Sequence, residues 1–514
     1  MNCSVNSSTV SRNRRETTGY EQFFQTEHLK KDLQARSFRG GVVTLGAQGA
    51  NFALGLLSTA ILARLLRPQD FGLVAMVTSI TAFIGLFKDL GLSNATVQRL
   101  HITHEQISFL FWINVVLSLA TTLLVIALAP VIAWFYHEPR LFHVTLILSL
   151  SFVISGLAVQ HQALLRRQMQ FKSLAVRDVI AMVCGFASGI TFACLGFGYW
   201  SLVAVPVATN VVNCILLWSI CHWRPGPLQR RVGARGMLAF GGNLTIFYLI
   251  NYFSRNFDNI LVGRVLGAAP LGIYSKAYGL LMLPLAQINF PMAAVLLPGL
   301  SHLQKEPVQY ARLFINAVRA ISLLGIPIVV FCFFFAHDVV HVLLGRRWLA
   351  VAPVFQLLAP AALVSTMSLL PSWLCQSLGR PQRQVHYALI SAPIYVLGFF
   401  IGIKWGIAGV AASYSLTFSC LFPWYVWYAS KDSPVRFSEI CIVFVSALLP
   451  ALIAGVIAWL AHSVLIIQER FPILSLTLGG SIFLLVYLAV AMLIPSNAAL
   501  IRSCVASARK TIGV

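Results

Sequence analysis

Long apolar stretches dominate the chain. Runs of about twenty apolar residues recur from Gly40 to Pro495, and short connections separate them. A helix of roughly 20 apolar residues can cross ~30 Å of hydrocarbon, where every backbone polar group must be paired internally. Charged residues make up 10% of the 514 residues, whereas soluble domains carry about a quarter. The sequence therefore predicts an all-α polytopic membrane protein with about 14 transmembrane helices.

One block of the sequence is written twice. Residues 64–66 (Arg-Leu-Leu) and 71–73 (Phe-Gly-Leu) correspond, two hundred positions later, to 264–266 (Arg-Val-Leu) and 271–273 (Leu-Gly-Ile). Each copy joins the end of one apolar run to the start of the next. Such internal duplication is typical of transporters whose two homologous halves face a cavity. We therefore expect two pseudo-symmetric six-helix lobes around a central cavity, followed by two C-terminal helices.

Polar stretches define the expected boundaries of these parts. Residues 1–39 are polar and basic and lack the apolar core of a signal peptide, so we expect a cytoplasmic segment that is not cleaved. The most polar interior stretch follows six apolar runs and precedes the second copy of the block. The expected parts after residue 39 are the first lobe 40–222, a cytoplasmic linker 223–236, the second lobe 237–430, and the last two helices with a short cytoplasmic tail, 431–514.

The net charge of +22 is distributed unevenly among the connections. With fourteen spans, basic residues concentrate on the side of both termini, as in 166–172 and 224–235, and the opposite connections hold far fewer. This asymmetry follows the positive-inside rule, so both termini are expected in the cytoplasm. The charge is explained by topology and by attraction to anionic membrane lipids, and we expect no nucleic acid partner.

Motifs for enzymatic chemistry are absent from the sequence. It contains no GxSxG, HExxH or P-loop, only fifteen carboxylates, and ten cysteines without CxxC spacing. The cysteines, most of them inside spans, are interpreted as small packing residues. We therefore expect no catalytic residues, no metal site, no cofactor, and a protein that is not an enzyme.

Polar residues inside the spans are the candidate functional residues, because ionisable groups there are costly unless they face an interior or a water-filled cavity. The predicted seventh span places several on one helical face through spacings of three and four: Tyr248, Asn251, Tyr252, Arg255, Asp258 and Asn259. Four more are Lys88 and Asp89 at the end of the second span, Lys276 in the eighth and Arg319 in the ninth. The basic members suit an anionic cargo such as a lipid pyrophosphate.

Structural interpretations of the same residues stay open. Arg255 and Asp258 could form a neutral pair that holds helices together, and Lys88 could extend to lipid headgroups. Arg64 and Arg264 are interpreted as anchors at the outer interface. The segment 337–341, with His337, Asp338 and His341 at the outer end of the ninth span, could form a proton relay or a metal site, but we favour a solvated helix end.

Several motifs together resemble those of one transporter family. They include residues 63–73 (ARLLRPQDFGL), 89–92 (DLGL), 97–99 (VQR), 258–264 (DNILVGR), 272–274 (GIY), 345–348 (GRRW) and 378–381 (LGRP). This pattern is similar to the polysaccharide transporter (oligosaccharide flippase) family of the multidrug/oligosaccharidyl-lipid/polysaccharide exporter superfamily, over about residues 40–430. Arg346 and Arg347 stand before Trp348, where relatives often carry an acidic residue. Any role that the family assigns to an acidic side chain at this position therefore cannot be transferred to this chain.

The resemblance implies a flippase of the bacterial inner membrane. Such a protein moves undecaprenyl-pyrophosphate-linked oligosaccharides across the membrane by alternating access, for exopolysaccharide, capsule or lipopolysaccharide biosynthesis, beside a polysaccharide polymerase and the export machinery. It also implies a cavity for pyrophosphate and sugar, for which this chain offers Lys88, Tyr248, Asn251, Tyr252, Arg255, Lys276 and Arg319. Ion coupling would then fall to Asp258 and Asp89.

Two alternative functions remain. An ion-coupled multidrug exporter of the same superfamily would be expected to favour acidic residues in its cavity, whereas the charged residues inside these spans are mainly basic. A membrane-embedded polysaccharide polymerase or ligase would be expected to need a sizeable periplasmic loop with reactive side chains, and the connections here are short.

Overall fold

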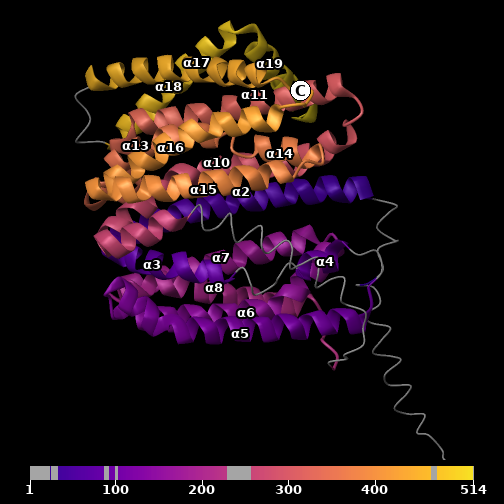
Figure 1. The fold of residues 1–514 in the computed structure, drawn as a ribbon, viewed down its shortest axis with the longest axis vertical. Coiled ribbons are helices and arrows are strands. Elements are labelled where there is room, and N and C mark those ends of the chain that lie inside the picture. The colour runs from indigo at the N-terminus through magenta and orange to yellow at the C-terminus, as the bar shows by residue number, and fades with distance from the viewer. Residues whose placement is uncertain are drawn as a thin grey trace, which may run out of the picture. The chain divides into compact units, whose positions relative to one another are not determined.

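The computed structural model of the chain consists of helices joined by short connections (Figure 1). It describes residues 24, 33–85, 92–98, 102–227, 256–464 and 472–512. Over these residues there is no β-strand, which confirms the expected all-helical class. Ten helical segments of the described chain are long and apolar enough to cross a membrane. The finer expectation of fourteen spans in two lobes stays a prediction.

The main helices keep the labels of Figure 1. They are α2 (Leu33–Leu65), α3 (Pro68–Gly85), α4 (Leu92–Gln98), α5 (His104–Tyr136), α6 (Arg140–Arg167), α7 (Phe171–Cys194), α8 (Trp200–Ile220), α10 (Ala268–His302), α11 (Pro307–Phe334), α12 (Ala336–Leu344), α13 (Val351–Ser365), α14 (Leu370–Ser377), α15 (Gln382–Gly402), α16 (Gly406–Ser430), α17 (Phe437–Val464), α18 (Pro472–Leu493) and α19 (Pro495–Ile512). Two 3-10 turns, η2 (Arg346–Trp348) and η3 (Ile403–Trp405), lie between them. The chain divides into two compact units, one of Met1–Ser58 with Leu73–Phe253 and one of Thr59–Gly72 with Ser254–Val514.

In the first unit, α5 and α6 form an antiparallel pair whose ends are set by local hydrogen bonds. The hydroxyl of Thr103 accepts a hydrogen bond from the backbone N–H of Gln106, whose side chain accepts one from the N–H of Thr103. His137 adopts a left-handed conformation that ends α5. Glu138 then pairs with Arg140 at 2.7 Å, and this hydrogen bond holds the pKa of Glu138 below its ordinary value.

Glycines bring the helices of this unit close together. A Cβ atom at Gly156 of α6 would overlap the side chain of Ser118 on α5. A Cβ atom at Gly185 of α7 would overlap Thr209 on α8. Helices in a membrane gain no hydrophobic stabilisation from associating, so small residues that permit close van der Waals packing stabilise them.

In the second unit, the last two long helices pack against α11. Gly455 of α17 and Gly479 of α18 leave room for the rings of Phe334 and Phe335, because a Cβ atom at either glycine would overlap them. The hydroxyl of Tyr487 on α18 donates a hydrogen bond to the carbonyl of Leu323 on α11 at 2.9 Å. These contacts join α17 and α18 firmly to the body of the unit.

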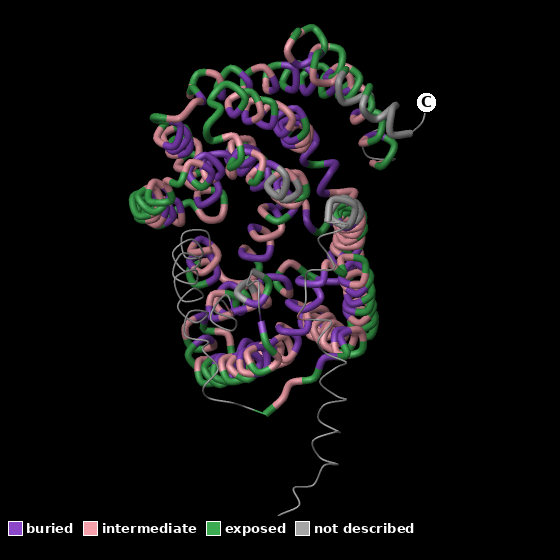
Figure 2. Tube along the Cα trace, turned by 90° about the vertical axis from the view of Figure 1, so that its right-hand side faces the viewer, coloured by how far each residue is buried: buried purple, intermediate pink, exposed green. Residues whose placement is uncertain are grey.

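Large apolar side chains cover the exposed sides of the helices. Figure 2 shows buried and exposed residues alternating around single helices, so that the helices have a buried side and an exposed side. The exposed sides carry residues such as Leu123 and Trp134 on α5 and Leu449, Ile453 and Leu460 on α17. Exposed apolar surface of this extent is suited to lipid and not to water. The protein is therefore a multi-pass membrane protein.

The two copies of the duplicated block meet inside the second unit. A Cβ atom at Gly72 would overlap the carbonyl group of Ala268, and one at Gly272 would overlap the carbonyl group of Pro68. Pro68 and Ala268 hold the same place in the two copies, as do the two glycines. The contact is therefore reciprocal, as expected where two repeats are related by a pseudo-twofold axis. We call it the glycine contact.

The glycine contact leads to a stability prediction. Gly272→Ala is expected to lower the melting temperature of the purified protein, because the new methyl group meets backbone that cannot rotate away and overpacking costs about 1–3 kcal/mol. Gly279→Ala on the same helix is the matched control, since a Cβ atom there has nothing within 4 Å. Thermal unfolding followed by size-exclusion chromatography in detergent checks both variants, and equal melting temperatures would contradict the close approach.

Candidate functional site

Lys276 lies on α10, one helical turn after the glycine contact. Its Nζ atom lies 4.2 Å from the centre of the Phe71 ring, a cation–π contact that contributes about 0.5–2 kcal/mol. Lys276 is half-buried, and no carboxylate among the described residues forms an ion pair with it. Its charge is thus held against an aromatic ring and is not neutralised by an acidic side chain of the described chain.

The indole of Trp348 holds Phe71 in place. The two rings meet edge to face with their centres 5.1 Å apart. Trp348 is fully buried, and its indole N–H donates a hydrogen bond to the carbonyl of Ala63 at 2.7 Å. The turn η2 is thereby fixed to the first copy of the duplicated block.

Arg64 makes a second connection between the same segments. Its Nη2 atom donates a hydrogen bond at 2.7 Å to the carbonyl of Val342, in the last turn of α12. A cation there interacts favourably with the partial negative charge of a helix C-terminus. This contact joins Arg64 to α12, and its expected place at the outer membrane interface stays a prediction.

Asp258 is buried close to the same helix. The hydroxyl of Tyr274 on α10 donates a hydrogen bond to Asp258 Oδ2 at 2.7 Å, and the backbone N–H of Asn259 donates one to Oδ1 at 2.8 Å. Asp258 is 3% exposed and Tyr274 is fully buried. Tyr274 and Lys276 are two positions apart on α10, so the structure brings the candidate carboxylate and the candidate amine to the same helix turn without pairing them.

A row of aromatic side chains lies near Tyr274 in the second unit. The ring of Tyr278 meets that of Tyr414 on α16 at 5.9 Å between centres, and Tyr414, Phe418 and Phe422 then stack in sequence at 5.8 and 5.7 Å. We did not predict this row from the sequence. The signal was the spacing of four residues on α16, which places the three rings on one helical face.

Arg319 lies on α11 and is half-buried, with an Nε atom that has no hydrogen-bond partner among the described residues. No contact in the described part of the chain joins it to Lys276 or Asp258. The other predicted site residues lie outside the described residues, and their places stay predictions: Lys88, Asp89, Tyr248, Asn251, Tyr252 and Arg255.

The segment 337–341 is not the solvated helix end that we favoured from the sequence. Asp338 is not at a solvated helix end: it is buried at 8% exposure, because His462 of α17 covers it. Only His337 of this group is well exposed. Among the described residues there is no cluster of three His, Cys, Asp or Glu side chains that could hold a metal ion.

Comparison with known proteins places the chain among proteins of polysaccharide biosynthesis. The sequence model of a family described as polysaccharide biosynthesis protein matches residues 61–353. The teichuronic acid biosynthesis protein TuaB of Bacillus subtilis (strain 168) is 25% identical over 397 residues, which cover 76% of this chain and 81% of that protein. The lipopolysaccharide biosynthesis protein WzxC of Escherichia coli (strain K12) is 26% identical over 320 residues, covering 61% and 64%.

Solved structures show the same fold. The lipid II flippase MurJ in its inward closed conformation superposes with a TM-score of 0.70 at 13% identity, covering 88% of this chain and 98% of that one. An inward-facing multidrug resistance MATE family transporter of the MOP superfamily gives a TM-score of 0.61 at 15% identity, covering 78% and 99%. At such identities the likeness concerns the fold alone. Because the family model spans more than half of the chain, the chain belongs to the polysaccharide biosynthesis protein family, and its fold is that of the exporter superfamily it resembles.

Proposed function

We propose that the protein is a flippase for undecaprenyl-pyrophosphate-linked oligosaccharides in the bacterial inner membrane, with fourteen spans, two six-helix lobes and both termini in the cytoplasm. It works by alternating access and is not an enzyme. The observation that carries the proposal is Lys276, a half-buried amine beside the duplicated contact that faces Phe71 and has no carboxylate partner in the described chain. A pyrophosphate would supply the missing negative charge.

The other candidate residues receive roles in the same scheme. Arg255, Arg319 and Lys88 add positive charge for the pyrophosphate, and Tyr248, Asn251 and Tyr252 contact sugar. Asp258 is the first candidate for ion coupling, with Asp89 as the second. A buried carboxylate held by a tyrosine hydroxyl is a group whose protonation changes its hydrogen bonds, which couples proton binding to the position of α10.

The ion-coupled multidrug exporter stays as a second candidate, favoured by the fold shared with a MATE family transporter. The names of the relatives in sequence, TuaB and WzxC, favour a polysaccharide precursor. The excess of basic residues inside the spans also suits an anionic cargo better than a cationic drug.

Removing positive charge from the site is expected to stop export. Arg255→Ala and Lys276→Ala should each lower surface polysaccharide at least about tenfold, because a charged hydrogen bond to phosphate is worth roughly 1.5–3 kcal/mol. Lys276→Arg should retain most export, and Lys404→Ala at an exposed position is the control. Surface polysaccharide of a complemented deletion strain is measured beside the amount of each variant in the membrane. Normal export by stably inserted Arg255→Ala and Lys276→Ala proteins would refute the assignment.

Replacing the buried carboxylate tests coupling. Asp258→Asn keeps the size of the side chain but cannot bind and release a proton at neutral pH. We expect proteoliposomes with this variant to lose the response of transport to an imposed proton gradient, whereas Glu306→Gln at an exposed position leaves it intact. A gradient response that survives in Asp258→Asn would remove this residue from the coupling scheme.

The proposed topology predicts where thiols can be labelled. A cysteine introduced by Gln229→Cys in the linker should react with an impermeant maleimide only in inside-out vesicles, and one introduced by Arg347→Cys only in intact cells. The parent chain corrects for its native cysteines. Labelling of both positions from the same side would contradict the fourteen-span topology.

A further inference from the structure

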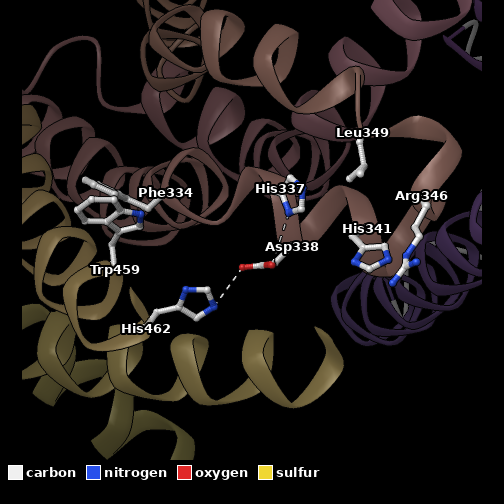
Figure 3. A pocket seen from close by; sticks show the side chains of 8 residues that line it. All are labelled: Phe334, His337, Asp338, His341, Arg346, Leu349, Trp459 and His462. Atoms are coloured by element: carbon white, nitrogen blue, oxygen red, sulfur yellow. Dashed lines mark ion pairs between the residues drawn. The ribbon is translucent and has the colours of Figure 1, made fainter. Parts of the chain in front are cut away.

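A cavity of about 440 Å³ lies within the second unit, where α12 and η2 approach α17 (Figure 3). None of the residues assigned to the cargo site lines it. Its wall contains one arginine, three histidines, one aspartate and two aromatic rings. Pockets that bind small ligands usually have a mainly apolar wall, whereas five of the eight lining residues here have ionisable side chains, which suits a polar ligand.

The polar centre of the cavity is held firmly. Asp338 Oδ2 lies 3.2 Å from Nε2 of the buried His462, which also contacts the hydroxyl of Ser475 on α18. The second carboxylate oxygen of Asp338 lies 3.9 Å from Nδ1 of His337. Figure 3 shows both imidazoles turned toward the carboxylate. Asp338 is therefore oriented by its neighbours and can accept hydrogen bonds from hydroxyl groups of a ligand.

A cationic end lies beside this centre. Figure 3 shows the guanidinium of Arg346 next to the ring of His341. Gly345, whose φ is 91°, ends α12 with a sharp turn that brings Arg346 over the last turn of the helix. The guanidinium is exposed and forms no ion pair with any acidic side chain that the structure describes. It is thus available for the carboxylate of a ligand, which an arginine can bind through two parallel hydrogen bonds.

An aromatic wall faces the polar groups from the opposite end. Phe334 and Trp459 both line the cavity, and Figure 3 shows them on the side away from Arg346. Gly455, one turn before Trp459 on α17, gives the Phe334 ring the room it needs. Trp459 is 47% exposed, so part of its indole surface is open. An amphipathic ring of this kind can pack against the apolar C–H face of a pyranose.

We propose that this cavity binds an acidic sugar residue, with its carboxylate on Arg346 and His341, its ring against Trp459 and its hydroxyls on the Asp338–His462 pair. The volume of about 440 Å³ accommodates one or two sugar rings. A site of this kind implies that the transported glycan contains uronic acid. This inference about the cargo rests on the proposed function.

Binding of free sugars to the full-length protein in nanodiscs tests the inference without transport. Titration calorimetry with glucuronate, glucose and inorganic phosphate is expected to show glucuronate binding at least about tenfold tighter than glucose, with phosphate unable to displace it. Arg346→Ala should remove the preference for glucuronate, and Arg346→Lys should restore part of it. Arg347→Ala, the exposed neighbour outside the cavity, should behave like the parent protein.

The aromatic wall has its own matched pair of variants. Trp459→Ala should lower the affinity for glucuronate and for glucose about fivefold. Trp405→Ala, at an exposed tryptophan of η3, should leave both affinities unchanged. No glucuronate binding, a preference that survives Arg346→Ala, or displacement by phosphate alone would overturn the inference. A protein that exports polysaccharide but does not bind glucuronate refutes only this site. One that binds glucuronate but does not move lipid-linked oligosaccharide refutes only the proposed function.

Discussion

The reciprocal backbone approach at Gly72 and Gly272 is the constraint on which the rest of the second unit depends. Neither helix can carry a side chain there, because the Cβ position is taken by the carbonyl group of Ala268 or Pro68. The two copies of the block are therefore held at the smallest separation that backbone permits. One turn along α10, this approach brings Lys276 onto the ring of Phe71, which also contacts Trp348 edge to face. Packing fixes the position of the amine, and no acidic side chain in the described ranges forms an ion pair with it.

The turn η2 links that contact to the cavity beside α17. Trp348, its last residue, reaches the first copy of the block through Phe71 and Ala63, and Arg346, its first, lines the cavity. Arg64 connects the same segments through the carbonyl of Val342. A displacement of the first copy relative to α10 must therefore also move η2, and with it the cationic end of the cavity. If the duplicated contact changes during transport, affinity at the cavity changes with it, because the two sites share a three-residue turn.

The helical class and the duplication could be predicted from the sequence because they are properties of local patterns, whereas the roles of Asp258 and Lys276 stay predictions. Apolar run length indicated the helices, and the polar residues of the apolar runs included Asp258 and Lys276. The partners of these residues could not be predicted, because Tyr274, Phe71 and Trp348 are brought to them by tertiary packing that no spacing encodes. The interpretation of Asp338 as solvated was wrong for the same reason. Its spacing to His337 and His341 suited a helix end, while the histidine that buries it lies far along the chain on α17.

The last two long helices lie beyond the region that the family model matches, yet α17 contributes residues to the cavity. The family model ends at residue 353, so it includes Asp338 and Arg346 but neither Trp459 nor His462. Two of the eight residues that line the cavity are thus supplied by a part of the chain that the family model does not match. Gly455 and Gly479 attach this part to Phe334 and Phe335 by close packing, which constrains backbone position but leaves the facing side chains free to differ. If the cavity binds sugar as proposed, a change of side chain on α17 can alter its selectivity without a change at the glycine contact.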